Sequence, residues 1–260
     1  MWTAAWLRFG YERYILEAHP LKRWLLRWWG WRQIGPRIRF GHLEQVTRDL
    51  HPKRILEIGC GWGQNLFALN RRWPSTELVG VDQDGRALAE ARRIAQELSV
   101  SRLRFVQATL PTLPVDGPFD LLLIVDVLEY IVDDREVLRR LRTVTAPHGR
   151  LLLHVPHRIT DQRRYLPVSH AVPGHVRPEY TRAEIEDVVR AAGWVLHVVH
   201  PTFGPWGTIA WECSRASERC GALGAIWFPL ILGLARLDVC AVHREGNGYL
   251  LVASPESGHG

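Results

Sequence analysis

Glycines and a carboxylate form the sharpest chemical pattern in the 260-residue sequence. The run Glu57-Ile-Gly-Cys-Gly-Trp-Gly63 lies between a short apolar stretch and a stretch with helical spacing, and Asp82 ends the next apolar stretch. Glycines at such a junction let the backbone turn tightly and approach a ligand, and an acid at the end of the neighbouring strand can accept hydrogen bonds from ribose hydroxyls. A dinucleotide site would need a further glycine where Gln64 stands. The pattern therefore predicts a site for a nucleoside without a pyrophosphate.

A second group of residues has the chemistry to move a proton. Residues 156–180 form an irregular stretch rich in His, Pro and Arg, and such stretches in compact domains are usually functional loops or lids. Histidine is well suited to accept a proton from a hydroxyl near neutral pH. The candidates for this chemistry are His175, His170, Glu129 and Tyr180. These histidines have neither HxxxH nor HxH spacing, so no metal site is predicted. A role in anchoring the loop is an equally simple explanation of His175.

Alternating strands and helices are predicted to position these residues. Strands are expected at 54–58, 77–82, 103–106, 119–125 and 150–155, separated by helices that end near Arg72, cover 85–98 and cover 133–145. A capping-box pattern, Thr181-Arg-Ala-Glu184, opens a later helix that ends at Gly193, and strands follow at 194–200 and 248–253. The alternation predicts an α/β fold, a doubly wound, mostly parallel sheet with helices on both faces.

The first 50 residues are predicted to form a helical cap on the main domain, residues 51–260. Apolar and aromatic positions recur there at three- and four-residue spacing, with breaks at Pro20 and at Gly35-Pro36. Residues 1–40 hold eight Arg and Lys against two acids, which accounts for the whole net charge of +6, and residues 1–31 hold six of the twelve Trp. Three interpretations are open: a cap that closes the site, an amphipathic helix on an anionic membrane, and a nucleic-acid contact. Interleaved basic and apolar residues favour the cap most and nucleic acid least.

An apolar segment, residues 207–237, precedes the last strand. Together with the loop at 156–180 it is expected to form a lid over a lipophilic acceptor, or else to extend the core. Its uncharged run from Cys220 to Ala235 is shorter than the ~20 residues of a membrane-spanning helix and contains Pro229, so a buried or interfacial helix is predicted. Four cysteines without a CxxC pair favour a reducing cytoplasm, with membrane association as an alternative.

Several stretches resemble the class I S-adenosylmethionine (SAM) dependent methyltransferases in order and spacing. Ile55–Gln64 resembles the first motif of that family, Val79–Asp82 its ribose-binding acid motif, and Phe119–Tyr130 its fourth-strand motif. Pro147–Pro156, then Gly174–Arg177, resemble the segments beyond it. The resemblance covers roughly residues 53–200 and is closest to the branch that includes the ubiquinone-type methyltransferases. It implies the Rossmann-like fold of that family with a seven-stranded sheet, SAM as the cofactor and S-adenosylhomocysteine as the product.

The resemblance also implies roles for single residues. The residues that it places on the cofactor are Glu57, Gly59, Cys60, Gly61 and Gln64 at the methionine end, Asp82 on the ribose, Gln83, Ala108 and Thr109 on the adenine, and Val125 and Asp126 at the methionine amino group. His175 falls at the Gly-His position of the family, which makes it the preferred base. The family commonly has an acid where Thr109 stands and a histidine where Tyr130 stands, so the roles of those two side chains are not transferred.

The sequence thus predicts an enzyme that transfers a methyl group from SAM to a small, partly hydrophobic acceptor. An isoprenoid, a quinone-like or phenol-like molecule and a lipid-linked precursor are the acceptor classes expected, and no nucleic-acid partner is expected. The first alternative is a SAM-binding or peripheral membrane module without enzymatic activity. The second is an NAD(P)-dependent oxidoreductase, which the missing third glycine disfavours.

Overall fold

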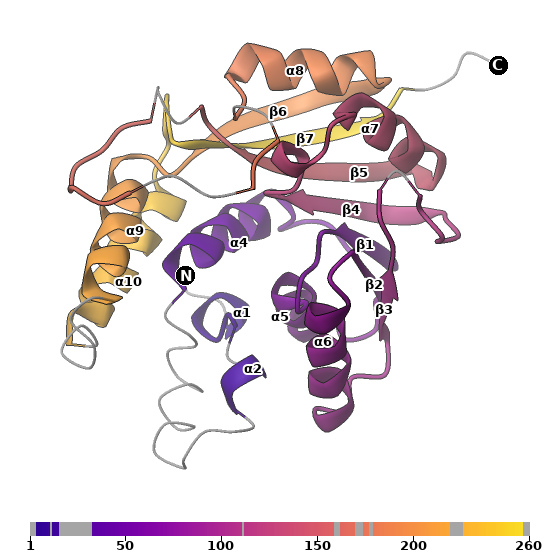
Figure 1. Ribbon diagram of the computed structural model, residues 1–260, viewed down its shortest axis with the longest axis horizontal. Helices are drawn as coiled ribbons and strands as arrows, with labels where there is room; N and C mark the ends of the chain where they lie inside the picture. The colour runs from indigo at the N-terminus through magenta and orange to yellow at the C-terminus, as the bar shows by residue number, and fades with distance from the viewer. Residues whose placement is uncertain are drawn as a thin grey trace.

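The computed structural model describes residues 4–10, 12–15, 33–110, 112–158, 162–169, 174–176, 179–218 and 226–256. Its centre is a seven-stranded sheet in the order β3-β2-β1-β4-β5-β7-β6 (Figure 1). Neighbouring strands from β3 to β5 are parallel, and β7 is antiparallel to both of its neighbours. The predicted doubly wound, mostly parallel sheet is confirmed. The strands are β1 (Arg54–Ile58), β2 (Glu77–Asp82), β3 (Leu103–Gln107), β4 (Phe119–Val125), β5 (Thr145–Pro156), β6 (Trp194–Thr202) and β7 (Gly248–Pro255).

Helices cover both faces of the sheet. On one face lie α4 (Ile34–Val46), α5 (Gln64–Arg72) and α6 (Gly85–Glu97), and on the other lie α7 (Asp134–Thr143) and α8 (Arg182–Ala191) (Figure 1). Alternate residues of β4 supply the two resulting cores, because Leu121 and Leu123 pack with the first group of helices and Leu122 and Ile124 with the second. The central strands are therefore apolar on both sides, as expected of buried parallel strands.

Local capping explains where several of these helices begin. The Asp84 carboxylate accepts hydrogen bonds from two backbone N–H groups in the first turn of α6, and Asp133 accepts one at the start of α7. Thr181 and Glu184 form the predicted capping box of α8, and Gly193, with φ +79°, follows its end. The caps of α6 and α7 start these helices shortly after β2 and β4 end. The carboxyl ends of parallel strands are where such a sheet binds ligands.

The prediction of a break at Gly35-Pro36 is wrong, because α4 runs through both residues. Pro36 lies in the first turn of α4, where its missing N–H would have had no partner within the helix. The short helix α1 (Ala4–Leu7) is fastened to α4 by reciprocal bonds: Trp6 Nε1 donates to the carbonyl of Arg37 (3.0 Å), and Arg37 Nη1 donates to the carbonyl of Trp6 (2.7 Å). Arg37 is fully buried, so this part of the basic segment packs inward.

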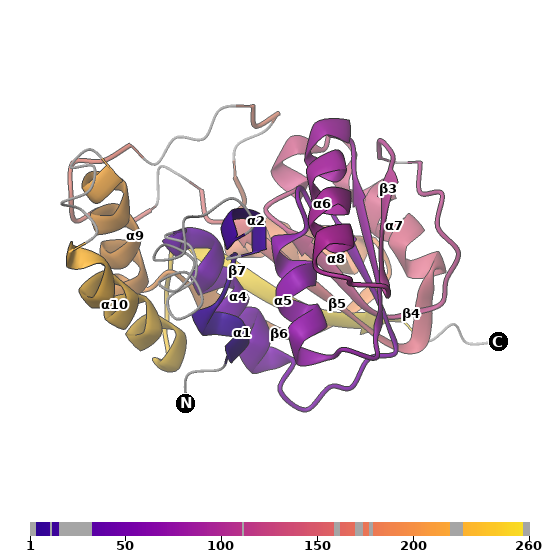
Figure 2. The same cartoon turned by 90° about the horizontal axis from the view of Figure 1, so that it is seen from below.

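Two helices stand beside the rest of the molecule. Helices α9 (Pro205–Glu218) and α10 (Phe228–Cys240) lie side by side and pack against α4 (Figures 1 and 2). Of the uncharged run that was predicted to form one helix, the described part is a short 3-10 turn at Ile226–Trp227 followed by α10, with Pro229 in its first turn. Among the described residues, no helix combines the length and the apolar character that crossing a membrane requires.

Candidate active site

The glycine run forms the turn between β1 and α5. Gly59, Gly61 and Gly63 have φ values of +69°, +53° and +82°, a region that residues with a Cβ rarely adopt. A Cβ on Gly59 would lie 2.2 Å from Cγ2 of Val127, which follows β4, whereas a Cβ on Gly61 would have no neighbour within 4 Å. The turn therefore packs against the end of β4 at Gly59 and is open at Gly61.

The Asp82 carboxylate holds this turn from the neighbouring strand. Asp82 is the last residue of β2, and its Oδ2 accepts a hydrogen bond from the backbone N–H of Gly61 (2.7 Å). Its Oδ1 accepts one from the N–H of Asp84 (2.8 Å). These two bonds fix the carboxylate at the edge of a cavity, and the remaining lone pairs of its oxygens can still accept hydroxyl groups.

Glu57 is a buried acid with one unsatisfied oxygen. Its Oε1 accepts a hydrogen bond from Asn65 Nδ2 (2.6 Å), and its Oε2 has no hydrogen-bond partner. Burial, reinforced by the charge of Asp82 and opposed by the bond from Asn65, raises the pKa of Glu57 to about 8. A buried carboxylate oxygen without a donor is costly, and a ligand ammonium group would remove that cost. The Oε1 atom of Gln64 is also buried without a partner, so two residues of the turn fit a ligand that carries donors.

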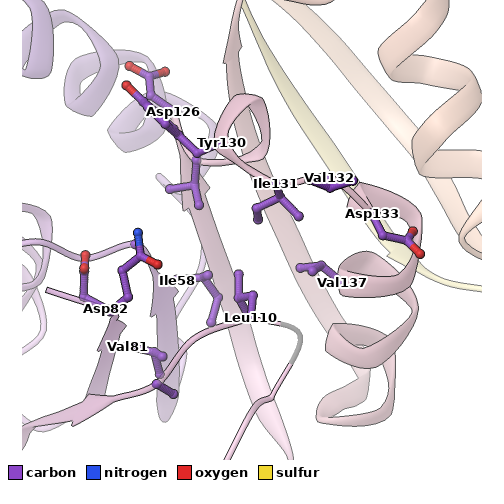
Figure 3. A pocket seen from close by; sticks show the side chains of 14 residues that line it. Ile58, Val81, Asp82, Leu110, Asp126, Tyr130, Ile131, Val132, Asp133 and Val137 are labelled. Carbon is purple, nitrogen blue, oxygen red and sulfur yellow. The ribbon is translucent and has the colours of Figure 1, made fainter. Parts of the chain in front are cut away.

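A cavity of about 570 Å³ lies at the carboxyl ends of β1, β2 and β4. Five of the predicted cofactor residues line it: Gly59, Asp82, Gln83, Ala108 and Asp126. Its other lining residues are mainly apolar, and they are Ile58, Val81, Leu110, Val127, Tyr130, Ile131, Val132, Asp133 and Val137. Figure 3 shows Ile131, Val132 and Val137 gathered on the side of the cavity opposite Asp82. A cavity of this volume with one apolar side suits a nucleoside ligand.

Asp126 directly follows β4, and each of its carboxylate oxygens contacts a basic side chain. Its Oδ2 is 2.5 Å from Arg39 Nη2 of α4, and its Oδ1 accepts a hydrogen bond from His154 Nδ1 of β5 (2.6 Å). Burial alone would raise the pKa of Asp126, but Arg39 and His154 outweigh it and hold that pKa below its usual range. The side chain is therefore an anion that is already paired on both oxygens.

His154 is a neutral bridge from Asp126 to β6. Burial lowers its pKa despite the neighbouring carboxylate, and its Nε2 is 2.9 Å from the hydroxyl of Thr202. Because a carboxylate only accepts, we assign the Nδ1–H tautomer, with Nε2 accepting from Thr202. The backbone N–H of Asp126 also donates to the carbonyl of His154 (3.0 Å).

A second acid, Glu129, lies close to Asp126 in the short helical turn after β4. It is almost fully buried, its Oε2 has no hydrogen-bond partner, and burial together with the charge of Asp126 raises its pKa to about 8. Tyr130, the next residue, is 41% exposed and lines the cavity. Its ring meets that of His175 edge-on at 4.9 Å between centroids.

His175 is oriented by an acid four residues along the chain. Its Nδ1 lies 3.1 Å from Oε1 of Glu179, which is itself buried. Since the carboxylate accepts, the bond favours the tautomer with Nδ1–H and leaves Nε2 as an acceptor. A carboxylate that orients an imidazole in this way is the arrangement found in acid–base catalysts.

The predicted residues fall into three groups. Those that line the cavity are named above. The residues that are not part of its lining are Glu57, Cys60, Gly61, Gln64, Thr109 and Val125. Burial, with the charge of Glu57, raises the pKa of the Cys60 thiol, which agrees with an inert residue. The Tyr180 hydroxyl donates to Asp134 (2.8 Å) within the core, and His170 lies outside the described residues. The catalytic roles of all four candidates stay predictions.

Sequence reasoning missed two residues of the site, Arg39 and His154. His154 lies within the strand predicted at 150–155, and β4 and β5 pair in parallel with Val125 opposite His154. Its place near the carboxyl end of a predicted parallel strand, where ligands bind, was a signal that the sequence contained. Arg39 was counted only as part of a basic segment. No local pattern places α4 beside the end of β4, so Arg39 could be found only from the structure.

The sheet order, the glycine turn after β1 and the acid at the end of β2 together define the class I SAM-dependent methyltransferase architecture. A family described as "Methyltransferase domain" matches residues 55–149. The chain is 38% identical over 105 residues to a trans-aconitate 2-methyltransferase of Pseudomonas aeruginosa (strain UCBPP-PA14), covering 40% of this chain and 36% of that protein. It is 31% identical over 136 residues to a ubiquinone biosynthesis O-methyltransferase of Aeromonas salmonicida (strain A449), covering 49% and 56%. Both matches span less than two thirds of the relative.

The solved structure of the (4+2)-cyclase SpnF aligns with a TM-score of 0.61 and 21% identity, covering 85% of this chain and 82% of SpnF, a likeness that concerns the fold. The chain is thus similar to SAM-dependent methyltransferases over residues 55–149, and its relatives include a methyltransferase of the ubiquinone-type branch. SAM is the cofactor of this class, and the unsatisfied Glu57 oxygen, the Asp82 carboxylate and the cavity between Asp82 and Asp126 fit it.

Proposed function

We propose that this protein transfers a methyl group from SAM to a small, partly hydrophobic acceptor. The observation that carries the proposal is the cavity that runs from Asp82 to Asp126, with His175 against Tyr130 of its lining and Glu129 close to Asp126. When bound, SAM supplies an electrophilic methyl group on a sulfonium. The task of the protein is then to hold the acceptor in line with that methyl group and to exclude water, which can provide most of the rate enhancement.

The charges around Asp126 argue for the chemical class of the acceptor. Arg39 is already paired with Asp126, and the acids Glu129 and Glu179 lie close by. Because the Arg39 guanidinium is held by Asp126 and Glu129 keeps its proton near neutral pH, this end of the site does not favour a polyanion such as the trans-aconitate named for the Pseudomonas relative. The exposed ring of Tyr130 offers a flat apolar surface instead. We infer a phenol-like or quinone-like acceptor, an isoprenoid or a lipid-linked precursor, in keeping with the name of the Aeromonas relative.

His175 is the base in this proposal. Glu179 holds its Nδ1, and its Nε2 can accept the proton that a hydroxyl acceptor loses as the new O–CH3 bond forms. The raised pKa of Glu129 keeps a proton on its carboxyl group near neutral pH. Glu129 is therefore not a second base in this proposal and contributes by its position beside Asp126. A carbon or thiolate nucleophile would need this base less.

The test has a binding step and a transfer step. Calorimetric titration with S-adenosylhomocysteine, NAD and NADP separates the cofactor classes, and binding of S-adenosylhomocysteine alone is expected. Methyl-labelled SAM is then incubated with the protein and a polyprenylated catechol, with trans-aconitate as the matched polyanionic acceptor. Label is expected in the catechol and not in trans-aconitate.

Three outcomes would contradict the proposal in different ways. Binding of NAD or NADP in place of S-adenosylhomocysteine would assign an oxidoreductase. Transfer to trans-aconitate alone would overturn the acceptor class. Tight binding of S-adenosylhomocysteine with no transfer to the catechol or to an extract of cellular lipids and small molecules would assign a binding module.

A further inference from the structure

Helix α10 has a buried face and an exposed face, and both faces are mainly apolar. Its inner positions, Phe228, Ile231, Leu232, Ala235, Asp238 and Val239, are buried against α4 and α9. Its outer positions are not polar, as they would be in an ordinary surface helix. The exposed and half-exposed residues of α10 and of the 3-10 turn that precedes it are Ile226, Trp227, Pro229, Leu230, Gly233, Leu234, Arg236, Leu237 and Cys240. Arg236 is the one charged residue among them.

The outer positions form one continuous stripe. Ile226, Leu230, Gly233 and Leu237 follow the four- and three-residue spacing of a single helix face. Ile226 is 72% exposed, Trp227 61%, Leu230 59% and Leu237 53%. Single exposed apolar residues are ordinary on a protein surface, but a contiguous apolar stripe marks an interaction site.

The described charged side chains that reach the surface of α9 and α10 are all positive. On α9 and α10 the described basic residues, Arg215 and Arg236, reach the surface, whereas the described carboxylates of Glu212 and Asp238 are fully buried. Glu212 accepts hydrogen bonds from the backbone N–H groups of residues 165 and 166, and Asp238 from that of Gly207. The surface of the two helices is therefore apolar and cationic in its described part.

We propose that the α10 stripe, defined as Ile226, Trp227, Leu230, Gly233 and Leu237, docks on the surface of an anionic lipid bilayer. An apolar helix face with a Trp at one end and Arg at its border lies in the interface between headgroups and acyl chains. The cations add attraction to anionic headgroups. Helices α9 and α10 stand at one side of the molecule, which leaves the stripe accessible (Figures 1 and 2). The inference is independent of which acceptor the enzyme methylates.

The size of the stripe argues against a second copy of the chain as its occupant. Helix α10 has 13 residues and is therefore about 20 Å long. One face of such a helix offers on the order of a few hundred Å². A stable protein interface buries about 800 Å² on each partner. A bilayer sets no such lower limit, because each inserted side chain contributes on its own.

The experiment is co-sedimentation of the full-length protein with vesicles, either of phosphatidylcholine alone or with one quarter phosphatidylglycerol. Binding to the anionic vesicles is expected, with at least tenfold weaker partitioning for Leu230→Gln/Leu237→Gln. The matched control is Val195→Gln, which makes an exposed apolar residue of β6 polar and should leave binding unchanged. Arg215→Gln should weaken binding to the anionic vesicles about fivefold and not alter binding to phosphatidylcholine.

Several results would overturn this proposal. Wild-type protein that stays in the supernatant, or a double variant that sediments like wild type, removes the α10 stripe from membrane contact. Equal binding to both vesicle types removes the electrostatic part and with it the choice of an anionic surface. Light scattering that shows a dimer dispersed by Leu230→Gln/Leu237→Gln assigns the stripe to a second copy. Titration with S-adenosylhomocysteine confirms that each variant is folded and keeps this outcome separate from the methyltransferase proposal.

Discussion

The two ends of the cavity are built in different ways. At the Asp82 end, the polar groups come from one stretch of chain between β1 and the start of α6, and most of them are backbone N–H groups and acids. Among the described residues, neither Glu57 nor Asp82 forms an ion pair with a basic side chain. At the Asp126 end, three distant elements supply Arg39, Asp126 and His154, and the acid is paired on both oxygens.

This difference indicates what each end can bind. Unpaired acids in a dry site favour a ligand that brings its own donors and positive charge, such as the ammonium and hydroxyl groups of SAM. A fully paired acid contributes little free charge and acts by fixing its surroundings. The Asp82 end is thus suited to recognition of one cofactor, and the Asp126 end to holding a catalytic side chain and a weakly polar acceptor in place.

The largest effect is expected at the Asp126 end, in the chemical step. His175→Ala should lower kcat by roughly 10²–10⁴ with S-adenosylhomocysteine affinity near wild type, because the base acts on the acceptor proton only. The acid limb of the rate–pH profile should disappear with it, since a protonated imidazole cannot accept a proton. His197→Ala, an exposed histidine of β6, is the control. Steady-state kinetics that stay within about threefold of wild type across pH 6–8 would remove His175 as the base and leave positioning as the source of catalysis.

The contact between the two ends is expected to have the next largest effect. Gly59→Ala places a Cβ against Val127 in addition to the cost of positive φ, so the free energy of unfolding should fall by about 2–4 kcal/mol. Gly61→Ala has the same kind of φ and open space around it, so its cost should be nearer ~1 kcal/mol. Urea denaturation of both variants measures the difference, and Val127→Ala should recover part of the loss at Gly59. Equal losses in the two alanine variants would show that packing of the turn on β4 contributes nothing.

At the Asp82 end the expected effect is on binding. Asp82→Ala should weaken S-adenosylhomocysteine binding by about 1.5–3 kcal/mol, or roughly 10- to 150-fold, through lost hydrogen bonds to a charged acceptor. Asp120→Ala is a matched control, because Asp120 also accepts two backbone N–H bonds, at the opposite end of the sheet. Calorimetric titration of both variants with S-adenosylhomocysteine measures the two dissociation constants that are compared. An unchanged dissociation constant for Asp82→Ala would place the ribose elsewhere.

The two ends also differ in how far sequence could predict them. The Asp82 end follows from local rules, since a glycine turn after a strand and an acid at the end of the next strand meet in any parallel sheet. The capping box at Thr181 and the buried strand at Phe119–Val125 were predicted for the same reason. Arg39, in contrast, reaches Asp126 only because α4 packs across the sheet. The helical character of this segment was predicted, and only the break at Gly35-Pro36 was wrong, because a proline in a first turn is tolerated.

The smallest expected effect concerns stability at the Asp126 end. Glu129 has its pKa raised to about 8 in the folded protein from about 4.5, so the folded state binds the proton more tightly than the unfolded state. The stability that the protonated group provides is complete below pH 4.5 and is lost as the pH rises through 8. Glu129→Gln mimics the protonated form and should flatten the decline, so its Tm should exceed that of wild type at pH 9 and lie close to it at pH 5. Glu136→Gln is the control, because Arg140 and Arg139 lower the pKa of Glu136, which is the opposite direction from Glu129. Parallel melting curves for wild type and Glu129→Gln across pH 5–9 would mean that Glu129 ionises normally, and the account of a protonated acid beside Asp126 would then be wrong.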